Sequence, residues 1–189
     1  PDFTATQKDF MTLIDGRMLD LSDRPPETLE ELERYLEATS ATLMRLSLYA
    51  LNINDARTKV AGREIGLAWG FMGLIRNLPI GSVSRRPCIP STILSGLGCS
   101  PTEKFLGPSP LLNQAVKTLA DEAEFHLRKA RTLVPEATKA ARGALSLGAL
   151  LRLYLDRLAR AKYNPYADKL RVSVLRRLLA LGMAWCQRY

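Results

Sequence analysis

The chain has 189 residues, of which 47% are hydrophobic and 24% are charged, as expected for one globular domain with a buried core and not for a disordered chain. The sequence contains no run of 18 or more apolar residues, so no membrane-spanning helix is predicted. The net charge is +8, but residues 1–60 hold 7 basic against 11 acidic side chains (−4), and residues 61–189 hold 20 against 8 (+12). The basic part favours diphosphates, anionic membranes or an acidic protein surface as partners; nucleic acid is not expected, because no recognition motif accompanies the charge.

The apolar periodicity is helical along nearly the whole chain, so we expect an all-α fold. A first helix is predicted over about residues 6–21 and ends before Pro25 and Pro26. One apolar face of it is expected to point into the core: Phe10, Leu13, Ile14, Met18 and Leu21. A second helix is predicted to begin at Thr28, where Glu31 completes a capping box, and to continue to Tyr49.

The stretch from residue 61 to 90, AGREIGLAWGFMGLIRNLPIGSVSRRPCIP, contains the helix around which the rest of the chain is expected to be organised. Every position from Ile65 to Ile75 is apolar or glycine, so this helix should be central, and Pro79 is expected to end it after Leu78. Four glycines lie along it, each costing about 1 kcal/mol relative to alanine: Gly62, Gly66, Gly70 and Gly73. They indicate a close neighbour, either a tightly packed helix or a long apolar ligand in a groove.

The residues after Pro79 are predicted to form a loop, followed by a short capped turn near Ser100 and Glu103. A long helix should begin at Ser109 and Pro110. Its predicted core stripe is Leu112, Val116, Leu119, Ala123, His126, Ala130 and Leu133.

A further helix is predicted from Pro135 to the break at residues 163–165. Its apolar run comprises Leu145, Leu150, Tyr154, Leu155 and Leu158. The last helix is expected over residues 168–186, with five residues facing inward: Leu170, Val174, Leu178, Leu181 and Trp185. Three arginines of the same segment are expected to face water: Arg171, Arg176 and Arg177.

Few residues can carry chemistry. His126 is the only histidine, which excludes histidine metal clusters, and a hydrogen-bonded core histidine is the favoured interpretation. Asp15 and Asp20 lie about 140° apart around a helix, so they do not share a face as two metal ligands would. The acidic residues near 30 and 121–124 are interpreted as surface charge. The three cysteines form no metal-ligand spacing and indicate a reducing compartment: Cys88, Cys99 and Cys186.

Several phrases are similar to segments of squalene and phytoene synthases, the head-to-head prenyltransferases. LIDGRMLDL (13–21) and ETLEELERY (27–35) resemble two of that family's helices, and YNPYADKL (163–170) resembles a late segment. GLAWGFMGLIRN (66–77) with RRPCIP (85–90) lies where the family has its second aspartate motif. The resemblance covers essentially the whole chain. It implies one isoprenoid-synthase-type helical domain over residues 1–189, without the family's opening helices and their first aspartate-rich motif.

The resemblance also implies a site in which two aspartates, four residues apart, bind Mg²⁺ and a prenyl diphosphate. In this chain these positions are Asn77 and Gly81, with Pro79 expected to break the turn between them, so no metal ligand and no catalytic residue is expected. The residues that the resemblance implies for ligand binding are Tyr35, Trp69, Gly73, Arg76, Asn77, Arg85 and Arg86. For the three arginines a solvated loop or a protein contact is an equal alternative.

Without the aspartates, the chain most resembles the branch of the family that assists the assembly of respiratory complex I, through AWG, LIRN-LP, SRR and FHLRKAR (125–131). This implies a non-catalytic or chemically altered protein that acts in assembly at a membrane surface, on the mitochondrial matrix side, or in the cytoplasm or at the inner membrane of a bacterium. Assembly partners, an anionic membrane and an isoprenoid or lipid in the central groove are the expected partners, and no cofactor is expected. The alternative is an active head-to-head prenyltransferase, which would need Mg²⁺.

Overall fold

The computed structural model describes residues 3–22, 24–81, 88–100, 105, 107–134, 137 and 139–186. Every regular element in these residues is helical, which confirms the all-α prediction. The α-helices are α1 (Phe3–Met18), α2 (Leu29–Leu36), α3 (Thr42–Ala50), α4 (Ala56–Gly81), α5 (Ser91–Gly96), α6 (Pro110–Leu133), α7 (Arg142–Leu145), α8 (Leu147–Arg160) and α9 (Val174–Cys186). Short 3₁₀ turns are η1 (Leu19–Leu21), η4 (Lys139–Ala141) and η5 (Asp168–Leu170), and η2 (Glu37–Ala41) is π-helical.

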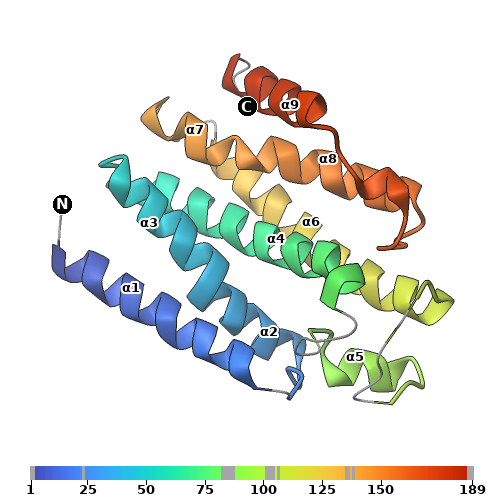
Figure 1. Cartoon of the computed structure of the whole chain (residues 1–189). Helices are drawn as coiled ribbons and strands as arrows, with labels where there is room; N and C mark the ends of the chain where they lie inside the picture. Colours follow the sequence, from blue (N-terminus) through green and yellow to red (C-terminus); the bar gives the residue numbers. More distant parts are fainter. Residues whose placement is uncertain are drawn as a thin grey trace.

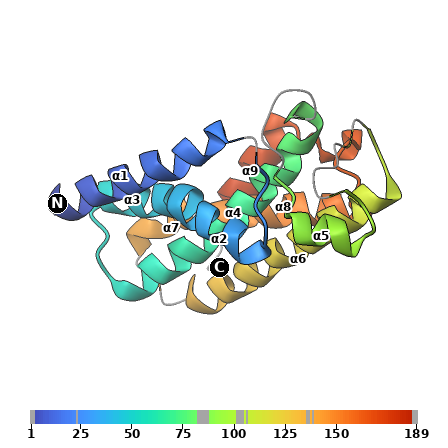
Figure 2. The same cartoon turned by 90° about the horizontal axis from the view of Figure 1, so that it is seen from below.

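The helices form a layered bundle with α4 at its centre (Figure 1). Helix α1 lies at one edge, the continuous rod of α2, η2 and α3 comes next, and α8 and α9 follow on the other side of α4. Helix α6 packs lengthwise along α4 with the opposite chain direction, as the view from below shows (Figure 2). The central position of α4 follows from its composition, because a helix that is apolar all round can bury every face.

Three glycines of α4 explain how the second layer approaches so closely. A Cβ on Gly66 would lie 2.6 Å from Cα of Ala41, and Cβ atoms on Gly62 and Gly70 would lie 2.6 Å and 2.8 Å from the side chains of Leu48 and Leu36. Tight helix packing therefore accounts for these three positions. Gly73 differs, since a Cβ there would meet no atom of the described residues within 4 Å.

The predicted starts of two helices are confirmed by their caps. The Thr28 side chain accepts a hydrogen bond from the backbone N–H of Glu31 at the start of α2, and Ser109 accepts one from Leu111 at the start of α6. The predicted stripe of α6 is buried up to Ala130. Helix α5 was not expected, because its start is fixed by distant contacts: the N–H groups of Ser91 and Thr92 donate to carbonyls of residues 26 and 27.

Two predicted faces are wrong. On α1 the apolar residues Phe10, Ile14 and Met18 are each more than half exposed, and so is Leu21 in η1. The side of α1 that contacts η2 carries Asp9 and Gly16, which lie roughly 100–180° away from those residues around the helix. An ion pair and a small residue, and not the apolar stripe, decided which side packs. On α9, likewise, Val174 and Leu178 are exposed, although Leu170 is buried as expected; the side chain of Trp185 lies outside the described residues.

Two helix boundaries also need correction. Pro79 does not end α4, which continues to Gly81. The fixed φ of proline is near the helical value and so permits this last turn, although proline lacks the N–H for a helical hydrogen bond and its ring crowds the carbonyl four residues earlier. The segment expected as one helix from Pro135 is divided into η4, α7 and α8, with a turn at Ser146 whose hydroxyl donates to the carbonyl of Gly143. Residues 101–104, where the turn after Ser100 was predicted, lie outside the described part.

Candidate functional site

The last three turns of α4 carry most of the residues that the family resemblance selects. Trp69, Gly73, Arg76 and Asn77 fall within about 100° of one another around the helix, so they share one face. Trp69 and Gly73 are half-buried, and Arg76 and Asn77 are exposed. The face therefore passes from the core to the surface within two turns.

Tyr154 of α8 connects this face to the next helix. Its ring meets the indole of Trp69 edge-on with centroids 6.2 Å apart, and the guanidinium carbon of Arg76 lies 4.4 Å from its centroid. The cation–π contact orients Arg76 along α8. Tyr154 was predicted only as a core residue of its helix, and it is buried. Its polar hydroxyl in an apolar stripe was the one signal that could have selected it.

Gly73 is the one glycine of the α4 stripe at which no described residue of a neighbouring helix approaches closely. The glycine stripe faces α3 at Gly62, η2 at Gly66 and α2 at Gly70, but at Gly73 no neighbouring atom would touch an added Cβ. The sequence left two explanations for the glycine stripe, a tightly packed helix or an apolar ligand, and helix packing explains Gly62, Gly66 and Gly70. At Gly73, which lies on the same face as Trp69 and Arg76, the described residues leave room for a Cβ.

The residues at the end of α4 do not fit a Mg²⁺ site. Because α4 continues through Pro79, Asn77 and Gly81 stand about 40° apart on one face, as two aspartates of the family would. Asn77 offers one neutral amide oxygen and Gly81 offers no side chain, whereas Mg²⁺ is bound through carboxylates. Among the described residues no group of three or more His, Cys, Asp or Glu side chains could hold a metal ion. The misfit lies in side-chain chemistry, and the predicted break at Pro79 is not its cause.

Tyr35 belongs to a different cluster, near the ends of α1 and η1. Its hydroxyl donates to Oδ1 of Asp20 at 2.8 Å and accepts from Arg17 at 3.1 Å, and Arg17 also pairs with Asp20. Through these contacts Asp20 ties the turn after α1 to α2. Arg85 and Arg86 lie outside the described residues.

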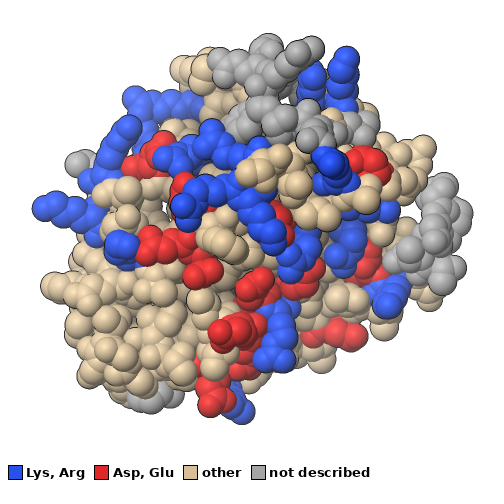
Figure 3. All heavy atoms as spheres, turned by 180° about the vertical axis from the view of Figure 1, so that it is seen from behind, with Lys and Arg blue, Asp and Glu red and all other residues tan. Residues whose placement is uncertain are grey.

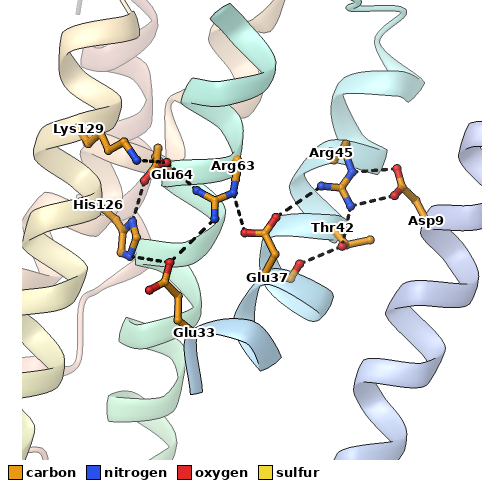
Figure 4. Close-up of polar contacts among 9 residues, drawn as sticks. All are labelled: Asp9, Glu33, Glu37, Thr42, Arg45, Arg63, Glu64, His126 and Lys129. Carbon is orange, nitrogen blue, oxygen red and sulfur yellow. Dashed lines mark hydrogen bonds and ion pairs between the residues drawn. The ribbon is translucent and has the colours of Figure 1, made fainter. Parts of the chain in front are cut away.

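A network of charged side chains on the first half of α4 was missed at the sequence level. Glu64 is fully buried and has three partners: Nδ1 of His126 at 2.7 Å, Nζ of Lys129 at 2.9 Å and a guanidinium nitrogen of Arg63 at 2.8 Å. Figure 4 shows these groups converging between α4 and α6. Because an ionised carboxylate can only accept, the Nδ1 of His126 carries the proton.

The network continues across the second layer to α1. Arg63 reaches Glu37 at 2.7 Å, Glu37 lies 3.7 Å from Arg45, and Arg45 binds Asp9 through two hydrogen bonds of 2.9 Å and 2.8 Å (Figure 4). Its members thus come from four layers of the bundle and fix the positions of these layers relative to one another.

The electrostatics of the network favour ionised groups. Burial raises the pKa of Glu64, but the hydrogen bonds from His126 and Lys129 and their positive charges outweigh it and lower the pKa to about 2. The hydrogen bond to Asp9 raises the pKa of Arg45. A lone charge in an apolar helix and a lone histidine in an apolar stripe were the two signals that could have predicted this pair. The prediction that His126 is a hydrogen-bonded core residue is confirmed.

The network can hold helices together, but its buried carboxylate already has its partners. The face at the end of α4 differs: it offers the Arg76 cation, and a Cβ added at Gly73 would meet no described atom within 4 Å. Within the described residues the second region is thus the better candidate for a ligand, and the first is a structural element.

Comparison with known proteins agrees with this fold. Residues 1–177 match the family model described as squalene/phytoene synthase. The NADH dehydrogenase (ubiquinone) complex I assembly factor 6 of Bos taurus is 30% identical over 187 residues, and that of Mus musculus is 28% identical over 187. Each alignment covers 97% of this chain and 56% of the relative, so the chain spans just over half of these relatives.

Solved structures give the same architecture at lower identity. The squalene synthase HpnC from Alicyclobacillus acidocaldarius superposes with a TM-score of 0.73 at 18% identity, over 84% of this chain and 61% of that one. YisP from Bacillus subtilis superposes with a TM-score of 0.75 at 17% identity, over 92% and 70%. At these identities the likeness concerns the fold, and it confirms the prediction of an isoprenoid-synthase-type helical bundle.

Proposed function

The chain belongs to the squalene/phytoene synthase family, and from this premise we propose that it is a non-catalytic member that acts in the assembly of respiratory complex I at a membrane surface. The observation that carries the proposal is the pair Asn77 and Gly81. The two positions share one face of α4, yet they supply no carboxylate where the family would bind Mg²⁺ and diphosphate.

The named relatives support the assembly role. Proteins called complex I assembly factor 6, or its homolog, match this chain in mammals, Drosophila melanogaster and Dictyostelium discoideum at 26–30% identity. We place the protein in the mitochondrion at the matrix side of the inner membrane, or, for a bacterial counterpart, on the cytoplasmic side. No helix in the described residues is long and apolar enough to cross a bilayer.

An apolar ligand remains part of the proposal. The half-buried Trp69 and the free space at Gly73 suit an isoprenoid or lipid chain, and Arg76 suits a phosphate at its head. Without a metal to polarise the diphosphate, such a ligand would be bound and not converted. Catalysis by an active prenyltransferase is the less favoured alternative.

Complementation tests the assembly role. The natural protein that contains this chain is expressed in animal cells lacking assembly factor 6, and assembled complex I is measured on native gels. We expect restoration by the wild type and equally by Asn77→Ala, because that change removes only an amide that is not needed as a metal ligand. Failure of the wild type, while a reintroduced assembly factor 6 restores the complex, would refute the role. Restoration that is lost with Asn77→Ala would point to chemistry at the end of α4.

A further inference from the structure

Helix α9 carries a second, outward apolar face that the fold leaves uncovered. Its inner side lies on α8 and α7, with Ala184 buried and Leu181 half-buried. The outward residues are 54–67% exposed: Val174, Leu175, Leu178, Leu179 and Met183. At about 100° per residue these positions fall within an arc of about 180°, which makes one continuous aliphatic surface. We call these five residues the α9 face.

The charge around the α9 face is strongly positive. Residues 139–189 hold 11 Lys and Arg against 2 Asp and Glu, a net +9, while residues 1–138 hold 16 against 17, a net −1. Arg171 and Arg176, next to the face, are exposed, as are Arg160 and Lys162 at the end of α8. Basic side chains also gather over the upper half of the molecule seen from behind (Figure 3). All of the protein's excess positive charge thus lies in the segment that contains α7, α8 and α9.

The position of α9 makes the face accessible to a flat surface. The helix is the outermost layer at one edge of the bundle, opposite to α1 (Figure 1). It has 13 residues, so it is too short to span a bilayer and suited to lie in the plane of one. Aliphatic residues on the outward side with arginines at the border are the composition of interfacial helices that bind anionic lipid.

We propose that the α9 face is a membrane-docking surface that inserts its aliphatic side chains at the headgroup boundary of an anionic bilayer, with Arg171 and Arg176 contacting lipid phosphates. The inference specifies the membrane contact of the proposed function and rests on that part of it. A second copy of the chain is disfavoured as the occupant, because pairing through α9 would bring two segments of net charge +9 together.

Helix α1 provides the matched control. It also exposes large apolar residues, including Phe10 and Ile14, but residues 3–22 hold three acidic and two basic side chains. An acidic segment is repelled by an anionic bilayer. The two faces thus share apolar exposure and differ in charge, which separates membrane docking from general hydrophobic adsorption.

Flotation with vesicles tests the proposal on the wild type and two double variants. Vesicles contain either phosphatidylcholine alone or about one third phosphatidylglycerol, at salt of about 0.05 M and about 0.5 M. We expect binding to the anionic vesicles that weakens in high salt. Leu175→Asn with Leu179→Asn should weaken it at least about tenfold, and Phe10→Asn with Ile14→Asn should leave it unchanged. All four positions are exposed, and circular dichroism checks that both variants stay folded.

Each other outcome would overturn the docking surface. Wild type that does not bind anionic vesicles, an α9 variant that binds as well as wild type, or an α1 variant that loses binding equally would each contradict it. Analytical ultracentrifugation of the same proteins tests whether a second copy of the chain occupies the face instead. A wild-type dimer that dissociates only in the α9 variant would assign the α9 face to self-association and contradict membrane docking. Vesicle binding can fail while complementation succeeds, so failure here is distinguishable from failure of the assembly role.

Discussion

The two halves of α4 differ in how their polar side chains are buried and in how closely other helices approach. In the first half Glu64 is buried and has three partners, and Gly66 lets a neighbouring backbone approach. In the second half Asn77 is exposed, and a Cβ added at Gly73 would meet no atom of the described part of the chain within 4 Å. The first half is held by ion pairs and close helix packing. The second half, where the family would bind metal, has fewer such contacts among the described residues. This difference agrees with the non-catalytic role that we propose.

The largest expected effect is at Glu64. Glu64→Ala leaves His126 and Lys129 without their buried partner, so we expect a loss of about 3–5 kcal/mol in the free energy of unfolding, measured by urea denaturation. Should that variant fail to fold, Glu64→Gln provides a milder change of the same sign. The matched control Asp121→Ala removes an exposed ion pair with Lys117 and should leave stability nearly unchanged. If Glu64→Ala and Asp121→Ala lowered the free energy of unfolding equally, the buried network would contribute no more to stability than a surface ion pair, contrary to this account.

The pH dependence of stability should depend on the same residue. The pKa of Glu64 is lowered from 4.5 to about 2, so its ionised form stabilises the fold fully above pH 4.5, and this contribution disappears as the pH falls towards 2. It amounts to about 3 kcal/mol. Denaturation of wild type and Glu64→Gln between pH 6 and pH 2.5 should therefore give a stability difference that shrinks with acid. A difference independent of pH would mean that Glu64 is not ionised in the folded protein.

The glycines of α4 should respond with opposite signs. Gly66→Ala would place a Cβ 2.6 Å from Cα of Ala41, and we expect a loss of about 1–3 kcal/mol. Gly73→Ala would meet nothing and gains helix propensity, so we expect stabilisation by up to about 1 kcal/mol. Thermal and urea denaturation measure both. If Gly73→Ala destabilised the fold as Gly66→Ala does, the second half of α4 would be as closely packed as the first.

The smallest expected effect is a gain of Mg²⁺ binding at the end of α4. Because the helix continues through Pro79, Asn77→Asp with Gly81→Asp should place two carboxylates on one face and give weak Mg²⁺ binding by calorimetry. Wild type should bind no Mg²⁺. A wild type that binds Mg²⁺ as well as the double variant does would show that other groups supply the ligands.

The helices could be predicted because their signals are local. The central α4, the caps at Thr28 and Ser109 and the stripe of α6 follow from composition and spacing. The orientation of α1 could not be predicted, because Asp9 pairs with Arg45, which is 36 positions away, and this contact turned the apolar stripe outward. Periodicity identifies the apolar side of a helix but does not reveal whether that side meets the core.

The candidate site was only partly accessible to sequence reasoning. The positions on α4 could be named from the resemblance, and their shared face follows from helical spacing. Tyr154, which contacts both Trp69 and Arg76, comes from a helix 78 positions after Arg76, so only the folded chain brings it there. The partners of Glu64 on α6 were invisible for the same reason.

Incubation of the natural protein containing this chain with farnesyl or geranylgeranyl diphosphate and Mg²⁺ tests the central claim most directly. Products are extracted and analysed by mass spectrometry, with an active squalene synthase run in parallel. We predict no coupled C30 or C40 product above the level of a blank, because Asn77 and Gly81 supply no carboxylate for the metal. Robust, Mg²⁺-dependent formation of such a product by the wild type would contradict the claim that this family member is not an enzyme.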